Sequence, residues 1–461
     1  MMDVPDPTAW HSLHLIGIGG AGMNGLARLL VARGIEVSGS DLKEFQGLAT
    51  LRESGAIVHV GHRAKQVGRP DAVVVSNAIP PENVELRASR QAGIPVLSRA
   101  QVLAALMRGR RGVAVAGTHG KTTTTSMISV MLARMGHEPT YVIGGDLNES
   151  GSGAEHGAGL VFVAEADESD GSFLLMQPEI AVVTNVEDDH LDFYPGPLEI
   201  EAAFAGFGSR AEKVVACWDD PGVRRALANV DRPVLRYGMG DEVDLSIRVN
   251  ELRWNGTLAS VKIGGKTLDL ELSVSGRHNV LNAGAALGVA ELLGLPLDEA
   301  AASLRSFSGV RRRFDCRGVA REATFIDDYA HHPSEVTTTL DAARIGGTRR
   351  IVAVFQPHRY TRTRAMWRRL GESLASADVV VVTDVYGAGE RPIPGVTGKL
   401  VVDSVAEASG GKRVVYLPHR WELAPFLAQE VRPGDLVITL GAGDITMVGE
   451  ETLALLREEV R

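Results

Sequence analysis

One run of residues in this chain has the types and the order that bind phosphate. Gly117-Thr118-His119-Gly120-Lys121-Thr122-Thr123 follows an apolar stretch, 113–116, and precedes a helical pattern with Met127, Val130 and Met131 on one face. A glycine-rich turn between a strand and a helix presents unpaired backbone N–H groups where the helix dipole favours negative charge. Lys121 can reach the β- and γ-phosphates of a nucleotide, and Thr122 can place its hydroxyl on Mg²⁺. The run therefore predicts a nucleoside triphosphate site.

The loop is shorter than the general phosphate-loop pattern. The first glycine of that pattern would fall at Val115, and here it is Gly117. A chance Gly-Lys-Thr at the start of a helix is the alternative, but the apolar strand before it and the helix after it favour a functional loop.

Two acid-rich segments follow strand-like runs further along the chain. The run 160–164 ends in Glu165-Ala166-Asp167-Glu168-Ser169-Asp170, and the run 180–184 leads to Glu187-Asp188-Asp189-His190. Ligands of open α/β sheets bind beyond the carboxyl ends of the strands, where these segments fall. Glu165 can reach a metal held by phosphates, and His190 can do so as a neutral imidazole, a ligand that suits Mn²⁺ better than Mg²⁺. The alternative is a pair of solvated acidic loops, and the phosphate loop upstream favours the metal site.

A second glycine-rich run lies near the N-terminus. Gly17-Ile18-Gly19-Gly20-Ala21-Gly22 joins a predicted strand, 13–18, to a predicted helix, and Asp41 follows the next strand, 35–38. Such a βαβ unit is typical of dinucleotide-binding folds, and the strand-like runs 71–76 and 94–97 extend its parallel sheet. Alone, the glycine run is equally compatible with a tight turn.

Polar clusters in the rest of the chain can bind anions or a base. Asp327-Asp328-Tyr329-Ala330-His331-His332 and Gln356-Pro357-His358-Arg359-Tyr360-Thr361-Arg362 contain histidines and two arginines that can fork onto a carboxylate or phosphate. A basic surface loop is the alternative for the second cluster. Asn279 and Asn282 share a predicted helix face and can hydrogen-bond a base, although Asn279 can also cap the helix.

These elements predict three α/β domains, as the length of 461 residues allows. We expect a Rossmann-like domain over 1–108, a central ATP-binding P-loop domain over 109–312, and a second Rossmann-like domain over 313–461. The central domain includes antiparallel hairpins in 245–274, where apolar and polar residues alternate and turns are expected at Asn255-Gly256 and Gly264-Gly265. The basic run 108–112 is interpreted as a linker.

Composition limits the class of protein and its partners. A net charge of −9 disfavours general binding to nucleic acid, and no apolar run approaches the length of a membrane span. Two cysteines far apart in the sequence suit a reducing compartment. Because the N-terminus lacks a signal-peptide pattern, we expect a cytoplasmic protein without membrane insertion.

Taken together, the motifs resemble the Mur ligases, ATP-dependent amide-forming enzymes of peptidoglycan synthesis. The resemblance covers essentially the whole chain and includes the shortened loop, because Gly-Thr-x-Gly-Lys-Thr is the usual form in that family. It rests on the two glycine-rich runs, the acidic segments and polar clusters quoted above, Thr184-Asn185-Val186, His278-Asn279-Val280-Leu281-Asn282-Ala283, Arg313-Phe314 and Pro333.

The resemblance also implies roles for individual residues. It places UDP in the first domain, with the diphosphate at Gly19, Gly20, Ala21 and Gly22 and the uridine near Asp41, His62 and Ser76. It places ATP at Gly117, Thr118, His119, Gly120, Lys121, Thr122, Thr123, Asn279, Asn282, Arg313 and Asp328, and metal ions at Thr122, Glu165 and His190. It places the second substrate cleft at Tyr329, His331, His358, Arg359 and Arg362. The catalytic residues would be Lys121, His190, His331, His358, Arg359 and Arg362.

The implied activity uses ATP and Mg²⁺, with Mn²⁺ as an alternative, to join L-alanine to the lactyl carboxylate of UDP-N-acetylmuramate. The protein would be a monomer or homodimer and would not bind nucleic acid.

The nearest alternative attaches a recycled tripeptide to the same sugar nucleotide, although Glu168-Ser169-Asp170 and Gly20-Ala21-Gly22-Met23 favour alanine. An NAD-dependent oxidoreductase would leave the phosphate loop unexplained. A non-catalytic nucleotide-binding regulator would not need the acidic, histidine and arginine clusters together.

Overall fold

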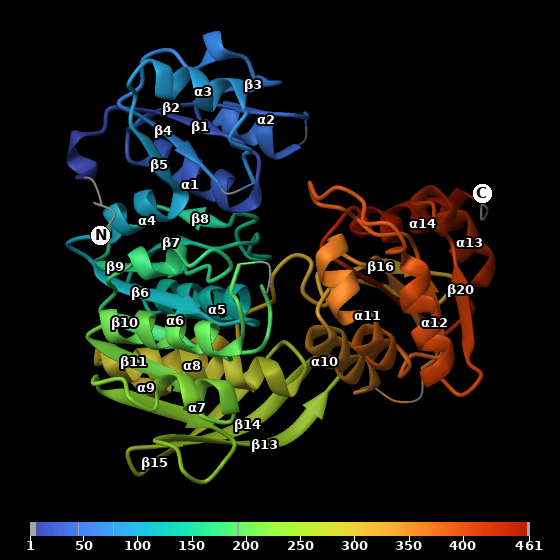
Figure 1. Cartoon of the computed structure of the whole chain (residues 1–461). Helices are drawn as coiled ribbons and strands as arrows, with labels where there is room; N and C mark the ends of the chain where they lie inside the picture. Colours follow the sequence, from blue (N-terminus) through green and yellow to red (C-terminus); the bar gives the residue numbers. More distant parts are fainter. Residues whose placement is uncertain are drawn as a thin grey trace. The chain divides into compact units, whose positions relative to one another are not determined.

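The computed structural model describes residues 6–44, 46–76, 78–190, 193–345, 347 and 349–458. The chain forms two compact units. The first comprises the residues up to Glu251 with Leu258–Ser273 and Asn279–Ser308, and the second comprises Leu252–Thr257, Val274–His278 and the residues from Gly309 onward. Figure 1 shows their three sheets: blue, teal to yellow-green, and orange to red.

The first sheet is wholly parallel, in the order β3-β2-β1-β4-β5. Its elements are β1 (Ser12–Ile16), α1 (Ala21–Ala32), β2 (Glu36–Asp41), α2 (Gln46–Glu53), β3 (Ile57–Val60), β4 (Ala72–Val75), α3 (Val84–Gln91), β5 (Val96–Ser98) and α4 (Arg99–Met107). The predicted βαβ unit is confirmed, and Leu26, Leu29 and Leu30 of α1 are fully buried. Because the chain continues to opposite sides of β1, the glycine-rich loop after β1 lies at the switch point of the sheet, where ligands bind.

The second sheet has the order β15-β14-β13-β12-β11-β10-β6-β9-β7-β8. Its first half consists of β6 (Arg111–Ala116), α5 (Lys121–Arg134), β7 (Thr140–Val142), β8 (Ala154–Glu155), β9 (Val161–Glu165), β10 (Ile180–Val183), α6 (Pro197–Arg210), β11 (Lys213–Cys217) and α7 (Pro221–Leu227). It continues with β12 (Val234–Gly238), β13 (Leu245–Arg253), β14 (Gly256–Ile263), β15 (Lys266–Leu272), α8 (Arg277–Leu293) and α9 (Leu297–Leu304). Strands β9 and β10 flank β6 in parallel, so the two acid-rich segments and the phosphate loop leave the same edge of the sheet.

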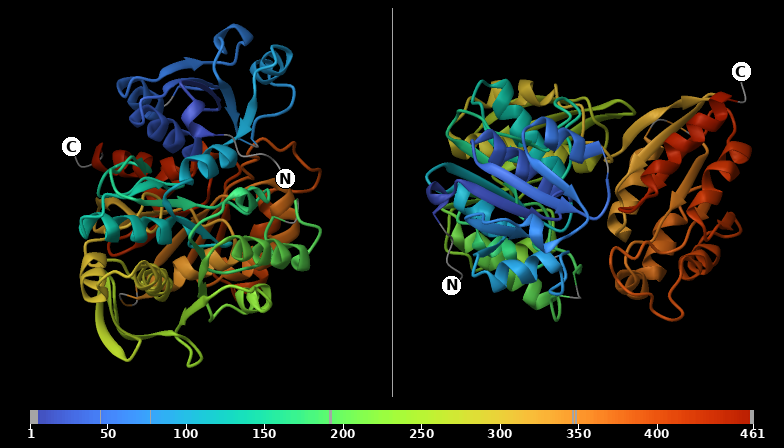
Figure 2. Two further views of the ribbon diagram at one scale, coloured as in Figure 1. Left: turned by 90° about the vertical axis from the view of Figure 1, so that its left-hand side faces the viewer. Right: turned by 90° about the horizontal axis from the view of Figure 1, so that it is seen from above.

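The third sheet, in the second unit, has the order β16-β17-β21-β18-β19-β20. Its elements are β16 (Asp315–Ala320), β17 (Ala323–Asp328), α10 (Pro333–Arg344), β18 (Ile351–Phe355), α11 (Tyr360–Leu374), β19 (Val379–Val382), α12 (Gly398–Ala408), β20 (Arg413–Tyr416), α13 (Leu423–Glu430), β21 (Leu436–Leu440) and α14 (Thr446–Glu458). One core packs α10, α11 and α12 on the sheet, and a separate core packs α13 and α14 on it; Figure 2 shows these elements from two further sides. The predicted α/β class, with parallel sheets and a small hairpin portion, is confirmed.

The expected linker 108–112 is wrong at its C-terminal end. Arg111 and Gly112 are the first residues of β6, where Arg111 forms an ion pair with Glu179 at 2.6 Å. Gly112 leaves room for Met107, because a Cβ there would lie 2.6 Å from the Met107 sulfur. A basic run that contains glycine is typical of a loop. Here the charge of Arg111 is compatible with a strand because Glu179 neutralises it.

Among the elements that the sequence did not predict are β3 and α9, and one predicted turn is shifted. The exposed edge strand β3 has no clear apolar alternation, and α9 is short. The hairpin turn expected at Asn255-Gly256 falls at Trp254-Asn255, and Gly256 begins β14. None of the described helices is both long enough and apolar enough to span a bilayer.

Candidate active site

Two glycines and the loop after β10 fix the conformation of the phosphate loop. Gly117 has φ 142° and Gly120 has φ 78°, backbone conformations that glycine adopts readily. The backbone N–H of Thr118 donates to the Asn185 carbonyl at 3.1 Å, and that of His119 donates to Asn185 Oδ1 at 2.7 Å. The N–H groups of the first turn of α5 therefore face the edge of the sheet from which the acid-rich segments emerge.

Lys121 and Glu168 form a buried ion pair at the centre of this edge. Lys121 Nζ donates to Glu168 Oε1 at 2.8 Å and to the Gly117 carbonyl at 2.6 Å. Burial lowers the pKa of Lys121, but the negative charges of Glu168, Asp167 and Glu165 outweigh it and the net shift is upward. Lys121 is therefore a cation whose ammonium group lies between the phosphate-loop backbone and Glu168.

Thr122 and Glu165 lie together, as the sequence predicted. The Thr122 hydroxyl donates to Glu165 Oε2 at 3.0 Å, and the backbone N–H of Gly144 donates to the same oxygen at 2.8 Å. Glu165 ends β9 and Thr122 lies in the first turn of α5. A hydroxyl and a carboxylate brought together from two elements are oxygen donors of the kind that Mg²⁺ prefers.

His190 approaches the same carboxylate as Lys121. Its Nε2 lies 3.4 Å from Glu168 Oε1 and 3.6 Å from Asp189 Oδ2. Burial lowers the pKa of His190, but the hydrogen bond to Glu168 and the charges of Asp189 and Glu168 give a net upward shift. The backbone of His190 has φ 55°, an uncommon conformation for a non-glycine residue that often occurs at functional sites.

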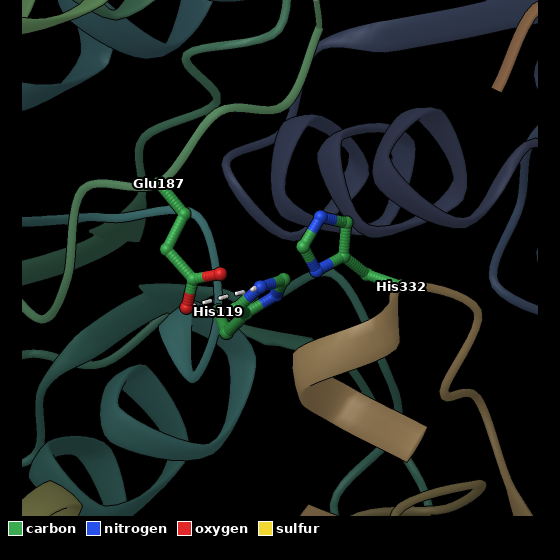
Figure 3. Close-up of side chains that lie close together, drawn as sticks. All are labelled: His119, Glu187 and His332. Atoms are coloured by element: carbon green, nitrogen blue, oxygen red, sulfur yellow. Dashed lines mark ion pairs between the residues drawn. The ribbon is translucent and has the colours of Figure 1, made fainter. Parts of the chain in front are cut away.

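Side chains from distant segments also border the loop. His119 Nε2 lies 3.7 Å from Glu187 Oε1, an ion pair drawn in Figure 3. Asn282 is nearly buried and accepts a hydrogen bond from the Thr124 hydroxyl at 3.1 Å. Asn279 is the third residue of α8 and therefore not its cap, and its Oδ1 accepts from Asn282 Nδ2 at 3.4 Å.

The glycine-rich loop of the first sheet is tied to Asp41. The backbone N–H of Gly19 donates to Asp41 Oδ2 at 2.9 Å, and Gly17, with φ 75°, makes the turn. Met23 is buried, so it packs in the core. Ser76 directly follows β4, and α1 begins at Ala21 and contains Gly22. Asp41, Ser76 and the loop thus leave one edge of the sheet.

His62 is part of a polar network under the same edge. The Ser40 hydroxyl donates to Glu85 Oε2 at 2.5 Å, and His62 Nδ1 lies 2.8 Å from the Ser40 oxygen. Glu85 and Ser40 are fully buried. Burial raises the pKa of Glu85, but hydrogen bonds from His14, Ser40 and the Arg63 backbone outweigh it and hold the carboxyl ionised. Because Ser40 gives its proton to Glu85, its oxygen accepts from His62 Nδ1–H, and this fixes the ring of His62.

In the second unit, four rings gather beyond the ends of β17, β18 and β19. Tyr329 contacts His331 with ring centroids 5.4 Å apart, His331 contacts His358 at 5.5 Å, and His358 stacks on Tyr386 at 5.8 Å. The Arg312 and Arg313 guanidinium groups each lie 4.9 Å from the Tyr329 ring centre. The cluster therefore combines aromatic faces with two guanidinium groups.

This positive environment acts on His358 and Asp328. Burial, followed by His331, Arg362, Arg359 and Arg312, lowers the pKa of His358 to about 3, so the ring is neutral at pH 7. Burial raises the pKa of Asp328 to about 6 despite the charge of Arg313. Arg362 Nη1 lies 3.4 Å from His358 Nδ1, and Arg359, the N-cap residue before α11, has a strained φ of 67°.

Comparison with known proteins accounts for all three sheets. Family profiles match three consecutive segments: "Mur ligase family, catalytic domain" over 12–111, "Mur ligase middle domain" over 115–290 and "Mur ligase, glutamate ligase domain" over 312–443. The chain belongs to the Mur ligase family. The predicted resemblance to the Mur ligases is therefore confirmed.

Individual Mur ligases match almost the whole chain. A UDP-N-acetylmuramate–L-alanine ligase of Pelotomaculum thermopropionicum is 48% identical over 97% of this chain and 98% of its own length. One of Rubrobacter xylanophilus is 49% identical over 96% of this chain and 100% of its own length. The crystal structure of UDP-N-acetylmuramate-alanine ligase from Thermotoga maritima aligns with a TM-score of 0.84 at 30% identity, covering 97% of this chain and 99% of that one. A murein peptide ligase of Psychrobacter arcticus aligns with a TM-score of 0.75 at 25% identity, covering 97% and 98%.

Sequence reasoning missed several residues of these sites. Glu168 stood in a predicted acidic segment without a role, and only the folded chain shows it between Lys121 and His190. Asn185, which holds the loop amides, stood in a quoted motif and is the kind of side chain that binds backbone N–H groups. Tyr386 carries no local signal, because its place depends on β19 pairing with β18.

Proposed function

We infer that this chain is an ATP-dependent ligase that joins L-alanine to the lactyl carboxylate of UDP-N-acetylmuramate in peptidoglycan precursor synthesis. One observation carries the inference: near-complete alignment at 48% and 49% identity with ligases of that name, in a chain whose phosphate loop holds Lys121, Thr122 and Glu165 together. Between the two ligase types among the similar structures, the alanine ligase is the more alike in both identity and TM-score.

The reaction needs activation of a carboxylate, because a carboxylate oxygen is a poor leaving group. The lactyl carboxylate attacks the γ-phosphorus of ATP, and an acyl phosphate and ADP form. The neutral amine of L-alanine then attacks the acyl carbon, phosphate leaves, and the nitrogen loses a proton. A carboxylate and a triphosphate repel each other, so the site must concentrate positive charge where they meet.

The phosphate loop supplies the first part of that charge. Lys121 and the loop 117–123 bind the β- and γ-phosphates, through N–H groups other than those of Thr118 and His119, which donate to Asn185. Asn279 and Asn282 on α8 face the adenine side. Asn282 supports this role because it lies against the loop: a Cβ on Gly120 would be 2.9 Å from its Oδ1. Arg313 and Asp328 of the second unit bind the ribose and phosphates.

The donor set fits divalent cations. Thr122 and Glu165 would hold one Mg²⁺, and His190 would help to hold a second, with Mn²⁺ as the alternative for a histidine ligand. Glu168 Oε2 is buried without a hydrogen-bond partner among the described residues, which is the situation that a cation relieves. When bound, the cations neutralise phosphate charge as it develops.

The other residues bind the remaining substrates. Gly19, Gly20, Ala21 and Gly22 bind the diphosphate of the UDP-sugar, and Asp41, His62 and Ser76 lie at its uridine. Tyr329, His331, His358, Arg359 and Arg362 form the surface for the lactyl carboxylate and alanine. His358 or His331 accepts the ammonium proton; His358 is neutral but has a low pKa, so anions bound beside its arginines would be needed to make it a better base.

The proposal includes the division of the chain into domains, its oligomeric state and its cellular compartment. The three functional domains would be 1–108, 109–312 and 313–461, acting in the cytoplasm as a monomer or homodimer.

The deciding experiment measures ADP release with UDP-N-acetylmuramate and Mg²⁺, adding L-alanine, a tripeptide or neither. Turnover with L-alanine alone is the expected result. Turnover only with the tripeptide would assign the chain to peptide recycling, and absence of turnover with both would overturn the proposed substrates.

A further inference from the structure

Arg99 lies against the glycine-rich loop of the first sheet. It is the first residue of α4, after Ser98, whose hydroxyl caps the helix by accepting from the Gln101 backbone. A Cβ built on Gly22 would collide with Arg99 Nη1 and lie 3.0 Å from its Cζ, so the guanidinium rests on the first turn of α1. Glycine at position 22 is what gives this guanidinium its place beside the loop.

The other side of Arg99 faces the acid-rich segment after β9. Arg99 Nη2 lies 3.8 Å from Asp167 Oδ2, an ion pair too long for a hydrogen bond. Burial raises the pKa of Asp167, but the positive charges of Lys121 and Arg99 outweigh it and lower the pKa overall. No hydrogen bond joins the Arg99 guanidinium to another described residue, and its side chain keeps 22% exposure. Its donors are therefore available to a ligand.

The charges around the loop call for such a cation. The net charge of the chain is −9, and the Asp41 carboxylate already accepts the N–H of Gly19. The Asp41 carboxylate repels a diphosphate that enters this loop, and the loop amides alone would have to overcome that repulsion. A positive side chain in the first turn of α4 also opposes the dipole of its own helix, so helix stability does not explain an arginine there.

We propose that Arg99 is a substrate-binding residue whose guanidinium turns from Asp167 to the diphosphate of the UDP-sugar. The inference rests on the proposed function, which puts that diphosphate at Gly19–Gly22. The planar fork of arginine matches two phosphate oxygens, whereas lysine offers a point charge.

The test is calorimetric titration of the full chain with UDP, UDP-N-acetylmuramate, UDP-N-acetylglucosamine and ATP. Arg99→Ala should weaken binding of all three uridine nucleotides by about 10- to 100-fold, the range for charge-assisted hydrogen bonds, and leave the ATP affinity unchanged. Arg99→Lys should recover part of the loss. Gly22→Ala, which displaces the guanidinium, should resemble Arg99→Ala. The matched control is Arg87→Ala, an exposed arginine on α3, which should bind all ligands as the parent does.

Three results would overturn the inference. Equal UDP affinity in the parent and Arg99→Ala would leave Arg99 with no part in binding. A loss for UDP-N-acetylmuramate alone would assign Arg99 to the lactyl carboxylate, because UDP-N-acetylglucosamine lacks that group. An equal loss of ATP affinity would mean that Arg99 only holds the fold. Failure of the proposed function is distinguishable: a parent protein that binds UDP through Arg99 but releases no ADP with L-alanine would keep the inference and lose the reaction.

Discussion

Lys121 Nζ and Glu168 Oε1 lie 2.8 Å apart, and only 14% of the lysine side chain and 2% of the glutamate side chain are exposed. If Lys121 turns to a phosphate, Glu168 keeps a buried negative charge that needs another partner. A divalent cation beside Glu168 and His190 would supply it. Binding of nucleotide and binding of cation are therefore coupled through one carboxylate.

The first prediction concerns that carboxylate. Glu168→Gln keeps the shape of the side chain but removes its charge, so the Mg²⁺ concentration for half-maximal ADP release should rise about 10- to 100-fold. Asp170→Asn is the control from the same segment, because among the described residues the Asp170 side chain accepts only the backbone N–H of Ser172. An unchanged Mg²⁺ requirement in Glu168→Gln would contradict the coupling.

The second prediction compares two threonines of α5. Thr122→Val removes the hydroxyl that contacts Glu165, and kcat should fall by about 10²- to 10³-fold. Thr125→Val removes a hydroxyl that bonds only to the Lys121 carbonyl within the helix, and it should change kcat by about threefold at most. Steady-state ADP release measures both. Equal losses in the two variants would point to a general defect of the helix.

The third prediction concerns glycines with positive φ. Gly117→Ala would bring a Cβ into the Thr184 hydroxyl and the Asn185 backbone, so ATP binding should be lost and the thermal midpoint should fall by several degrees. Gly55→Ala also places alanine at a large positive φ, 104°, but meets no atom within 4 Å, so it tests backbone strain without a steric clash. Calorimetric titration with ATP and thermal melts compare them. Retained ATP binding in Gly117→Ala would show that the loop can rearrange.

The fourth prediction concerns pH. Burial lowers the pKa of His278 to about 4, and burial with neighbouring positive groups lowers that of His358 to about 3. Below about pH 6.5 the unfolded chain binds protons at these histidines that the folded chain does not, so stability falls as the pH drops from about 6.5 toward 4. His358→Gln and His278→Gln should each lose less stability than the parent between pH 7.5 and pH 5, measured by urea midpoints. Identical losses in parent and variants would place the pH dependence elsewhere.

Local patterns predicted the parts of the fold and site that depend on neighbouring residues. Strand, loop and helix around Lys121 follow from apolar runs and glycine spacing, and Met127 and Met131 are fully buried as their periodicity required. Thr122 and Glu165 were expected together because carboxyl ends of adjacent parallel strands share an edge.

Other parts depend on long-range pairing that no local pattern records. Arg111 reads as a linker residue until Glu179 pairs with it across the sheet. Glu168 is one of several acids in its segment, and only its position against Lys121 separates it from Asp167 and Asp170. Tyr386 reaches His358 because β19 lies beside β18.

The short connection between α4 and β6, residues 108–110, joins the first sheet to the second within the first unit. Arg110 Nη1 donates to the Gly159 carbonyl at 2.6 Å, and one continuous apolar core joins residues of the first sheet, such as Leu15, to residues of the second, such as Phe162. Trypsin cleaves after arginine, so the sequence predicts a cleavage site at Arg108, Arg110 and Arg111. Arg108 and Gly109 are exposed in the turn after α4, whereas Arg110 is half-buried and Arg111 begins β6. A protease that binds residues on both sides of the cleaved bond would have to pull apart the end of α4 or the start of β6. We therefore expect cleavage here to be slow in the folded chain and its rate to report local opening of this junction.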